Sequence, residues 1–242
     1  MALPKIVTPE FDTKIPSTQE EIRYRPFLVK EEKVLFMAME SQDQKAVAQA
    51  MTQVLGNCIL EPTDINLNKL AAYDVEYLFL QLRAKSVGEN IKIMVNHPGY
   101  ADDTNICQHA TEVEIPIDDI KIEGKSAGQP IMLTDTMGMK LRHPTMHDMT
   151  NVAAVGEDPN MDQVMEMLYG LVDQVFDAEE VYDNFSREEI TEFMESLNQK
   201  QFEDIMNHFQ DMPGLRYEVE WTCPACGQPE KVMLEGITAF FT

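Results

Sequence analysis

Apolar residues recur every three or four positions in two stretches near the N-terminus, which is the spacing of one buried helix face. In residues 30–55 these positions are Val47, Ala50, Met51, Val54 and Leu55. Gly56 follows where a C-terminal cap is expected. A second stretch begins near Asp64, a residue type that caps helices, and continues to Gly88. The pattern predicts a helical region over residues 30–90.

The period changes to two after this region, and short alternating runs such as EVEIPIDDIKIEG are separated by turn-forming residues. We therefore predict a β-rich region over residues 91–143. Helical periodicity returns after Pro144, where SREE forms a capping box at Ser186 and Asn198 can cap the next helix. This pattern predicts an acidic helical region over residues 144–213.

The two ends of the chain have different patterns. Residues 1–29 are punctuated by prolines and read as an extended arm, in which Tyr24, Pro26 and Phe27 offer rigid apolar anchors for a protein partner. Residues 214–242 contain two alternating runs on either side of a cysteine pair, which predicts a terminal hairpin.

The order of these elements predicts an α+β protein. Helical segments flank a small central antiparallel β region, and the chain ends in a β-hairpin that resembles a zinc ribbon.

Charge narrows the classes of partner. The chain has 242 residues and a formal net charge of −23. This charge disfavours binding to nucleic acid and to anionic membrane surfaces. No run of residues approaches the ~20 apolar positions of a spanning helix, and MALPKIVTPEFDTK lacks the apolar core of a signal peptide. We expect the protein to be located in a cytosol.

The cysteine pair lies in the stretch WTCPACGQPEKVMLEG, and its shape is that of a zinc knuckle. The turn directs the thiols of Cys223 and Cys226 to the same side. A structural zinc site needs four ligands, and the chain has no second CxxC. The remaining candidate ligands are Cys58, Cys107, His97 and His109.

Two interpretations of the cysteine pair stay open. Cys107 and His109 stand in a stretch that repeats the plan of the tail, so they can complete a site with Cys223 and Cys226 that holds a single structural zinc. The other interpretation, which we prefer, is a hairpin that keeps the knuckle shape without any cofactor. A thioredoxin-like redox pair is disfavoured, because there the CxxC opens a helix, whereas strand-like residues follow Cys226.

Two other patterns resemble functional motifs but lack a residue or the geometry that the motif needs. Gly124-Lys125-Ser126 lacks the earlier glycine of a phosphate-binding loop and has Asp119 at that position. His143 and His147 are separated by Pro144, which breaks the helix that would align them. We therefore expect that the protein is not an enzyme.

Several stretches, in their order along the chain, resemble the base plate proteins of T-even-like contractile-tailed phages, and in particular the hub component that is also described as a hub assembly factor. They are LPKIVTPEFDTKIPST, YRPFLVKEEKVLFMAMES, LFLQLRAKSVGE, FMESLNQKQFEDIMNHFQDMP and LEGITAFF. The chain departs from this resemblance at His97-Pro98-Gly99, where we would expect a second CxxC-like turn in relatives.

The resemblance implies a non-enzymatic protein that helps to build the baseplate hub in the host cytoplasm and belongs to the virion. Its partners would be other hub and tail proteins, with no role for nucleic acid or membrane. The alternative from another class is an intracellular zinc-ribbon adaptor unrelated to phage tails.

Overall fold

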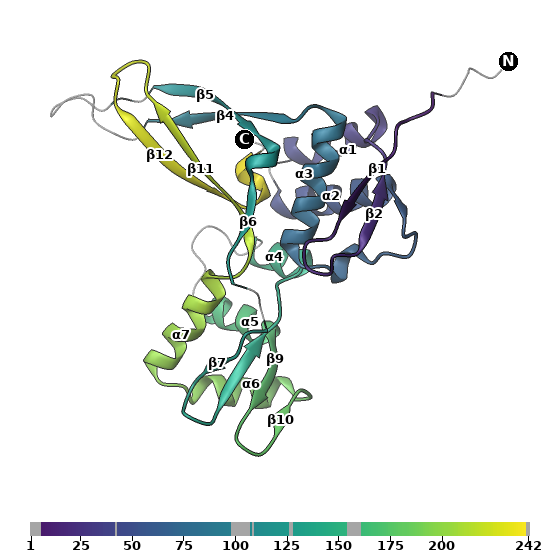
Figure 1. Ribbon diagram of the computed structural model, residues 1–242. Helices are drawn as coiled ribbons and strands as arrows, with labels where there is room; N and C mark the ends of the chain where they lie inside the picture. The colour runs from purple at the N-terminus through teal and green to yellow at the C-terminus, as the bar shows by residue number, and fades with distance from the viewer. Residues whose placement is uncertain are drawn as a thin grey trace.

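The computed structural model describes residues 6–41, 43–97, 107, 109–125, 128–153 and 161–240. These residues form seven α-helices and four small antiparallel sheets, so the mixed α and β content predicted from the sequence is confirmed. Figure 1 shows an upper lobe that contains both ends of the chain and a lower lobe built from its middle. Each lobe has its own apolar core.

The upper lobe is organised around helix α3 (Ala72–Ser86), which is buried on most of its circumference. Helices α1 (Val29–Glu40) and α2 (Gln44–Cys58) lie beside it. The predicted apolar stripe of α2 is confirmed at Ala50, Met51, Val54 and Leu55, which are all buried. A helix that is apolar on nearly every face belongs in the centre of a core, and α3 has that position.

The helix boundaries differ from the prediction at three points. The stretch over residues 30–55 is two helices, because the side chain of Asp43 accepts a hydrogen bond from the Lys45 amide and starts a new helix. Gly56 lies inside α2 rather than capping it. The next helix begins at Ala72, after a 3-10 turn (η1, Leu67–Lys69), and not at Asp64.

The N-terminal segment forms a sheet on the surface of the upper lobe. Strands β1 (Phe11–Lys14), β2 (Glu21–Tyr24) and β3 (Ile59–Glu61) pair in that order. The loop between β1 and β2 is fixed to α3, because the backbone amide and hydroxyl of Ser17 both donate to the buried carboxylate of Asp74.

This sheet corrects the expectation of an extended arm over residues 1–29, because Phe11–Lys14 and Glu21–Tyr24 are paired strands of the upper lobe. Tyr24 is 5% exposed and belongs to the upper core, so it is not available as an anchor for a partner. Pro26 and Phe27 are half-buried, and the backbone amide of Phe27 donates to the Ser86 hydroxyl of α3. Polar and apolar residues alternate along β2, and its two apolar residues are buried in the upper core. The prolines around β2 obscure this pattern in the sequence.

Two hairpins extend from the upper lobe (Figure 1). One pairs β4 (Asn90–Asn96) with β5 (Ala110–Pro116), after which the chain forms a 3-10 turn (η2, Ile117–Asp119). The other is the predicted C-terminal hairpin, of β11 (Gly214–Thr222) with β12 (Pro229–Glu235). The chain then closes with a 3-10 turn (η3, Ile237–Phe240) that places Phe240 in the core.

The lower lobe packs helices against a four-stranded sheet with the order β10-β9-β8-β7. Its strands are β7 (Ile131–Met132), β8 (Gly138–Leu141), β9 (Val172–Phe176) and β10 (Val181–Tyr182). Its helices are α5 (Met161–Leu171), α6 (Arg187–Glu195) and α7 (Gln199–Gln210). The capping box predicted at Ser186 and the cap predicted at Asn198 begin α6 and α7, and Asn198 also forms a capping box. The region over residues 144–213 is not purely helical, because β9 and β10 complete the sheet.

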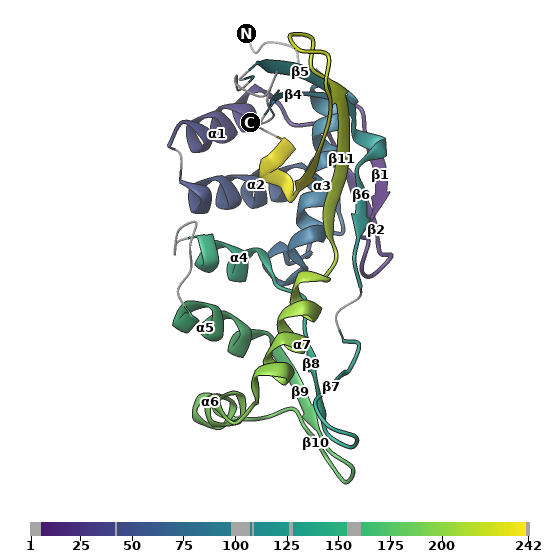
Figure 2. The same cartoon turned by 90° about the vertical axis from the view of Figure 1, so that its left-hand side faces the viewer.

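Helices from both lobes stack along one side of the molecule. In Figure 2 they follow one another as α1, α2, α4, α5 and α6, and neighbouring helices in this series are in contact. Helix α4 (Met146–Ala153) stands at the junction, because Met146 belongs to the upper core while α4 also contacts α5. The stack gives the two lobes a continuous helical face.

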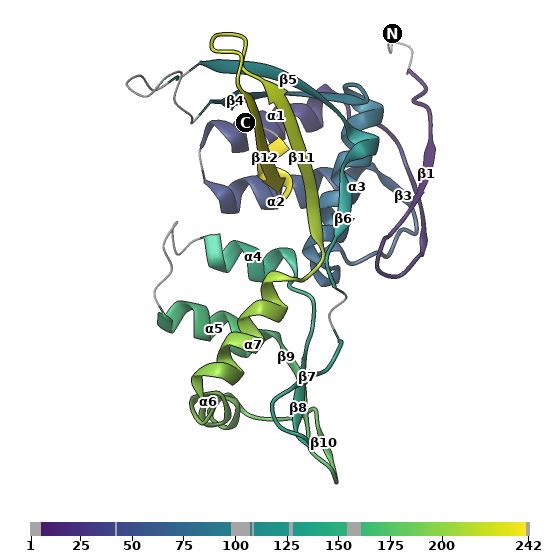
Figure 3. The same cartoon turned by 60° about the vertical axis from the view of Figure 1, so that its left-hand side comes forward.

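The lower lobe is inserted between two paired strands of the upper lobe. The chain leaves the upper lobe after β6 (Lys121–Glu123) and returns at β11, and β6 pairs with β11 in antiparallel register (Figure 3). The two crossings are linked because Lys125 forms an ion pair with Asp211 at 2.6 Å. At Gly124, a Cβ atom would lie 2.6 Å from the Met212 carbonyl oxygen, so only glycine fits there.

A second link between the lobes is centred on Arg142. Its guanidinium donates two hydrogen bonds to Asp148 at the start of α4 and one to the Gly170 carbonyl at the end of α5. Thr145 donates to the same carboxylate through its amide and its hydroxyl. Partial burial raises the pKa of Asp148, but the hydrogen bonds from Arg142 and Thr145 outweigh this effect and hold the pKa at about 2.

We predict that Asp148→Asn destabilises the protein at neutral pH by about 1 to 2 kcal/mol, after allowing for solvent screening. The pKa of Asp148 is lower in the folded state than in the unfolded state. The contribution of Asp148 to stability is therefore present when the pH is above its unfolded-state pKa, and it is lost as pH falls toward 2. Urea denaturation at pH 7 and at pH 3 measures this difference. A cost for Asp148→Asn that is equal at both pH values would contradict the ionic origin of the link.

Candidate functional site

Four metal-ligating side chains meet where the tips of the two hairpins come together. They are His97, Cys107, Cys223 and Cys226, and their donor atoms all lie within 4.8 Å of one another. The Cys107 and Cys223 sulfur atoms are 3.7 Å apart. The Cys226 sulfur and His97 Nδ1 are also 3.7 Å apart.

Each hairpin contributes two of the four side chains. His97 directly follows β4, and Cys107 lies shortly before β5. Cys223 directly follows β11, and Cys226 lies in the turn that leads to β12. The cluster therefore joins two hairpin tips that are more than a hundred positions apart in the chain.

The turn between β11 and β12 directs its two thiols to the same side. The Gly227 amide donates to the Cys223 carbonyl at 2.8 Å, and the Cys223 amide donates to the Gln228 carbonyl at 2.9 Å. Gly227 has a φ of 75°, a left-handed conformation that glycine adopts without strain. The knuckle shape predicted from the sequence thus has a backbone that supports it.

His97 is oriented by a carboxylate. Its side chain is fully buried, and its Nε2 lies 2.7 Å from Oε1 of Glu230 on β12. In a neutral ring, a hydrogen bond to the Glu230 carboxylate places the proton on Nε2. Nδ1, which faces Cys226, then carries the free lone pair.

The electrostatics of the two knuckle thiols differ. Burial raises the pKa of Cys223, but the amides of Cys226 and Ala225 and the neighbouring thiols lower it to about 7. At Cys226 the Gln228 amide lowers the pKa, while burial and the thiols of Cys223 and Cys107 outweigh this effect and raise it. Ionisation of one thiol therefore opposes ionisation of its neighbour, and a bound cation would remove this opposition.

Three of the four ligand candidates proposed from the sequence lie in the cluster, and the fourth does not. Cys107, Cys223 and Cys226 are together, whereas His109 is exposed and only its backbone carbonyl, which accepts from the His97 amide, touches the site. His97 was among the remaining candidates but outside the proposed set.

The alternation of β4 is the signal that identifies His97. Ile91, Ile93 and Val95 are buried, and the next position of this period is His97. Cys58, the other remaining candidate, is buried in the upper core far along the chain from the hairpin tips, and burial raises the pKa of its thiol to about 11. It has no part in the cluster.

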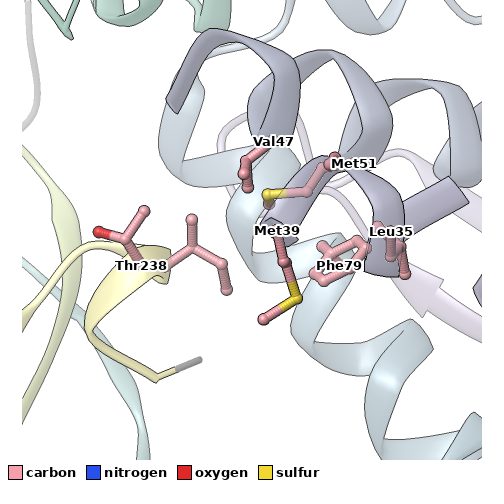
Figure 4. Close-up of a pocket in the computed structure, with 8 residues that line it drawn as sticks. Leu35, Met39, Val47, Met51, Phe79 and Thr238 are labelled. Atoms are coloured by element: carbon pink, nitrogen blue, oxygen red, sulfur yellow. The ribbon is translucent and has the colours of Figure 1, made fainter. Parts of the chain in front are cut away.

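A second feature is the apolar surface of α1. Val29, Phe36 and Met37 are 67%, 61% and 71% exposed, and by helical spacing they lie on one side of the helix. Behind α1, a cavity of about 190 Å³ is lined by the apolar side chains shown in Figure 4. Its walls include Met39 of α1, Met51 of α2, Phe79 of α3 and Thr238 of η3.

The fold and these sites define a protein of two small lobes, with exposed apolar residues on its outer helix α1 and a cysteine and histidine cluster at the hairpin tips. The family of T4 bacteriophage base plate proteins matches residues 8–242, nearly the whole chain. The chain belongs to this family, which confirms the resemblance seen in the sequence.

The other comparisons add no further relatives. No curated protein matches the chain, and no solved structure matches it. None of the helices in the described part of the chain has the length and apolar character needed to cross a membrane.

A partly buried carboxyl near the cavity gives a prediction. Glu76 of α3 accepts a hydrogen bond from the Ile237 amide of η3, and burial raises its pKa to about 7. The pKa of the Glu76 carboxyl is higher in the folded state than in the unfolded state. At a pH below the unfolded-state pKa the carboxyl is protonated in both states and does not oppose folding, but it lowers the stability of the protein as pH rises through 7. Glu76→Gln should therefore raise the free energy of unfolding at pH 8, by about 3 kcal/mol at most.

Chemical denaturation at pH 4.5 and pH 8 tests this expectation, and the gain should be absent at the lower pH. Glu192→Gln, at an exposed position on α6, is the matched control and should change little at either pH. An unchanged stability of Glu76→Gln at pH 8 would show that the Glu76 carboxylate is well solvated.

Proposed function

We propose that this chain is a non-enzymatic component or assembly factor of the baseplate hub of a contractile phage tail, and that it acts through contacts with other tail proteins. The observation that carries the proposal is the family match over residues 8–242. It also removes support for the alternative of an adaptor unrelated to phage tails.

The chemistry of the described residues supports a role without catalysis. Outside the cysteine and histidine cluster and the buried thiol of Cys58, the groups with the most strongly shifted pKa values are explained by packing or by a structural partner. Asp148 binds Arg142, Glu76 accepts a hydrogen bond from the Ile237 amide of η3, and Tyr24 is buried in the upper core. Strongly perturbed groups mark catalytic sites when they converge in a cleft, and these three do not share one.

The outer face of α1 is the contact surface that we propose. Large apolar side chains that are exposed side by side mark protein interaction sites. Val29, Phe36 and Met37 are exposed on one side of α1, where Lys33 and Glu40 are exposed among them, and Met side chains adapt well to a partner surface. The occupant that we assign is an apolar segment of a neighbouring base plate protein, because the family builds a multiprotein assembly.

Charge supports the choice of partner. A net charge of −23 opposes contact with nucleic acid or with anionic membranes, and it favours a protein with basic residues around its apolar segment. In this proposal the protein joins its partners in the host cytoplasm and belongs to the tail baseplate of the virion.

The α1 surface gives a specific prediction. Met37→Glu should reduce co-purification with the other base plate proteins of the same phage at least tenfold, because it places a charge in the apolar contact. The matched control is Met94→Glu, which changes an exposed methionine of β4 instead. Both variants should retain the circular dichroism spectrum and melting temperature of the unchanged protein.

Two results would oppose this prediction. If Met37→Glu and Met94→Glu bind equally well, the contact surface is not on α1. If the unchanged chain captures no base plate protein in co-expressing cells, the hub role itself is lost.

The distinction between a hub component and an assembly factor can be measured directly. We expect mass spectrometry of purified virions to detect this chain in amounts proportional to the other baseplate proteins. Detection in hub intermediates but not in virions would instead identify an assembly factor. Its absence from both fractions would contradict the proposal.

A further inference from the structure

We propose that His97, Cys107, Cys223 and Cys226 bind one structural zinc ion, which holds the tips of the two hairpins together. This inference is independent of the role in the baseplate. It rests on the geometry of the four donors, on their chemistry and on the contacts around them.

The spacing of the donors fits a tetrahedral ion. With Zn–S bonds of about 2.3 Å and a Zn–N bond of about 2.0 to 2.1 Å, sulfur atoms at neighbouring corners are about 3.8 Å apart and a sulfur and a nitrogen about 3.6 Å apart. The corresponding distances here are 3.7 Å for Cys107 to Cys223 and 3.7 Å for Cys226 to His97. All four cysteines of the chain are free, so no disulfide competes for these sulfur atoms.

The donor set selects zinc by its chemistry. Three cysteine sulfurs and one histidine nitrogen are a known structural zinc set. Soft thiolate ligands disfavour magnesium and calcium, which prefer oxygen ligands. Four protein donors also fill a tetrahedral ion, and His97 and Cys223 are almost fully buried, so the position left open in catalytic zinc sites is missing.

The surroundings of His97 support the same assignment. Metal-binding histidines usually donate their second ring N–H to a carboxylate, which fixes the orientation of the ring and makes it a better ligand. Glu230 provides this carboxylate at 2.7 Å from Nε2, so Nδ1 is directed toward Cys226 and the other thiols. Without a metal, burying an imidazole among three thiols has no comparable structural reason.

The ion would have a clear mechanical role. The β4–β5 sheet has only two strands, and such a hairpin is marginally stable by itself. A metal that joins His97 and Cys107 on this hairpin to Cys223 and Cys226 on the other cross-links both tips. Because the unfolded chain does not hold such a site, metal binding also favours the folded state.

The test uses the full chain, purified under reducing, anaerobic conditions, supplied with Zn²⁺ and dialysed. Elemental analysis should give about one zinc per chain. Two matched pairs of variants identify the ligands. His97→Gln and Cys107→Ser should retain less than about a tenth of an equivalent, whereas His109→Gln and Cys58→Ser should retain the full amount.

Two further measurements apply if a ligand variant fails to fold. Glu230→Gln leaves the four donors in place and should weaken zinc affinity about 10- to 100-fold while keeping one ion per chain. Replacement of zinc by Co²⁺ in the unchanged protein should give a tetrahedral spectrum with the charge-transfer intensity of three thiolates.

Several outcomes would overturn the assignment. They are less than about a tenth of an equivalent of zinc in the reduced, unchanged chain, bound iron in place of zinc, or a cobalt spectrum with fewer than three thiolates. Retention of zinc by His97→Gln together with its loss from His109→Gln would also contradict it.

Discussion

The pairing of β6 with β11 is the constraint on which the rest of the molecule depends. It opposes Ile122 to Leu215 across a gap of about ninety residues, and Leu215 is completely buried. A slip of one residue would turn Leu215 to the other face of the sheet, so the core fixes the register. With this register set, the rest of β11 extends beside the β4–β5 hairpin, and Cys223 comes to lie against Cys107.

Features with a local cause could be predicted from the sequence. The capping boxes at Ser186 and Asn198 need only residues three positions apart, and both begin helices as expected. The strand β9 could not be predicted in this way. Its residues continue the apolar run of α5, and they form a strand because β8 lies alongside to accept their hydrogen bonds. Such pairing depends on tertiary structure, which periodicity does not report.

The candidate site also has a part that local sequence predicts and a part that depends on tertiary structure. The turn that holds Cys223 and Cys226 is local, and the sequence predicts its shape. The choice between His97 and His109 is not local, because the two residues face each other at the end of one hairpin, where the His97 amide donates to the His109 carbonyl. The burial alternation of β4 favours His97, and the position of Glu230 on the other hairpin, which follows from the β6–β11 register, completes the distinction. The prediction that Tyr24 is an anchor for a partner was wrong for a similar reason, because its burial depends on packing against the core around α3.

Some buried polar residues of this protein are paired, whereas large apolar residues are exposed on α1. Three buried polar residues of the described chain are paired: Glu31 with Arg25, Asp74 with Ser17, and His97 with Glu230. Buried polar groups that are paired in this manner specify one arrangement of their elements. Apolar groups, by contrast, are left uncovered on α1, the helix at the end of the stack.

A monomer gains no stability from exposing Phe36 and Met37, and in solution such a face is a liability for association. The net charge of −23 opposes self-association of the free protein without covering that face. The paired buried polar residues thus find their partners within the chain, whereas the apolar side chains of α1 remain exposed. A neighbouring protein that covers α1 would bury them, and a base plate is an assembly in which such neighbours exist.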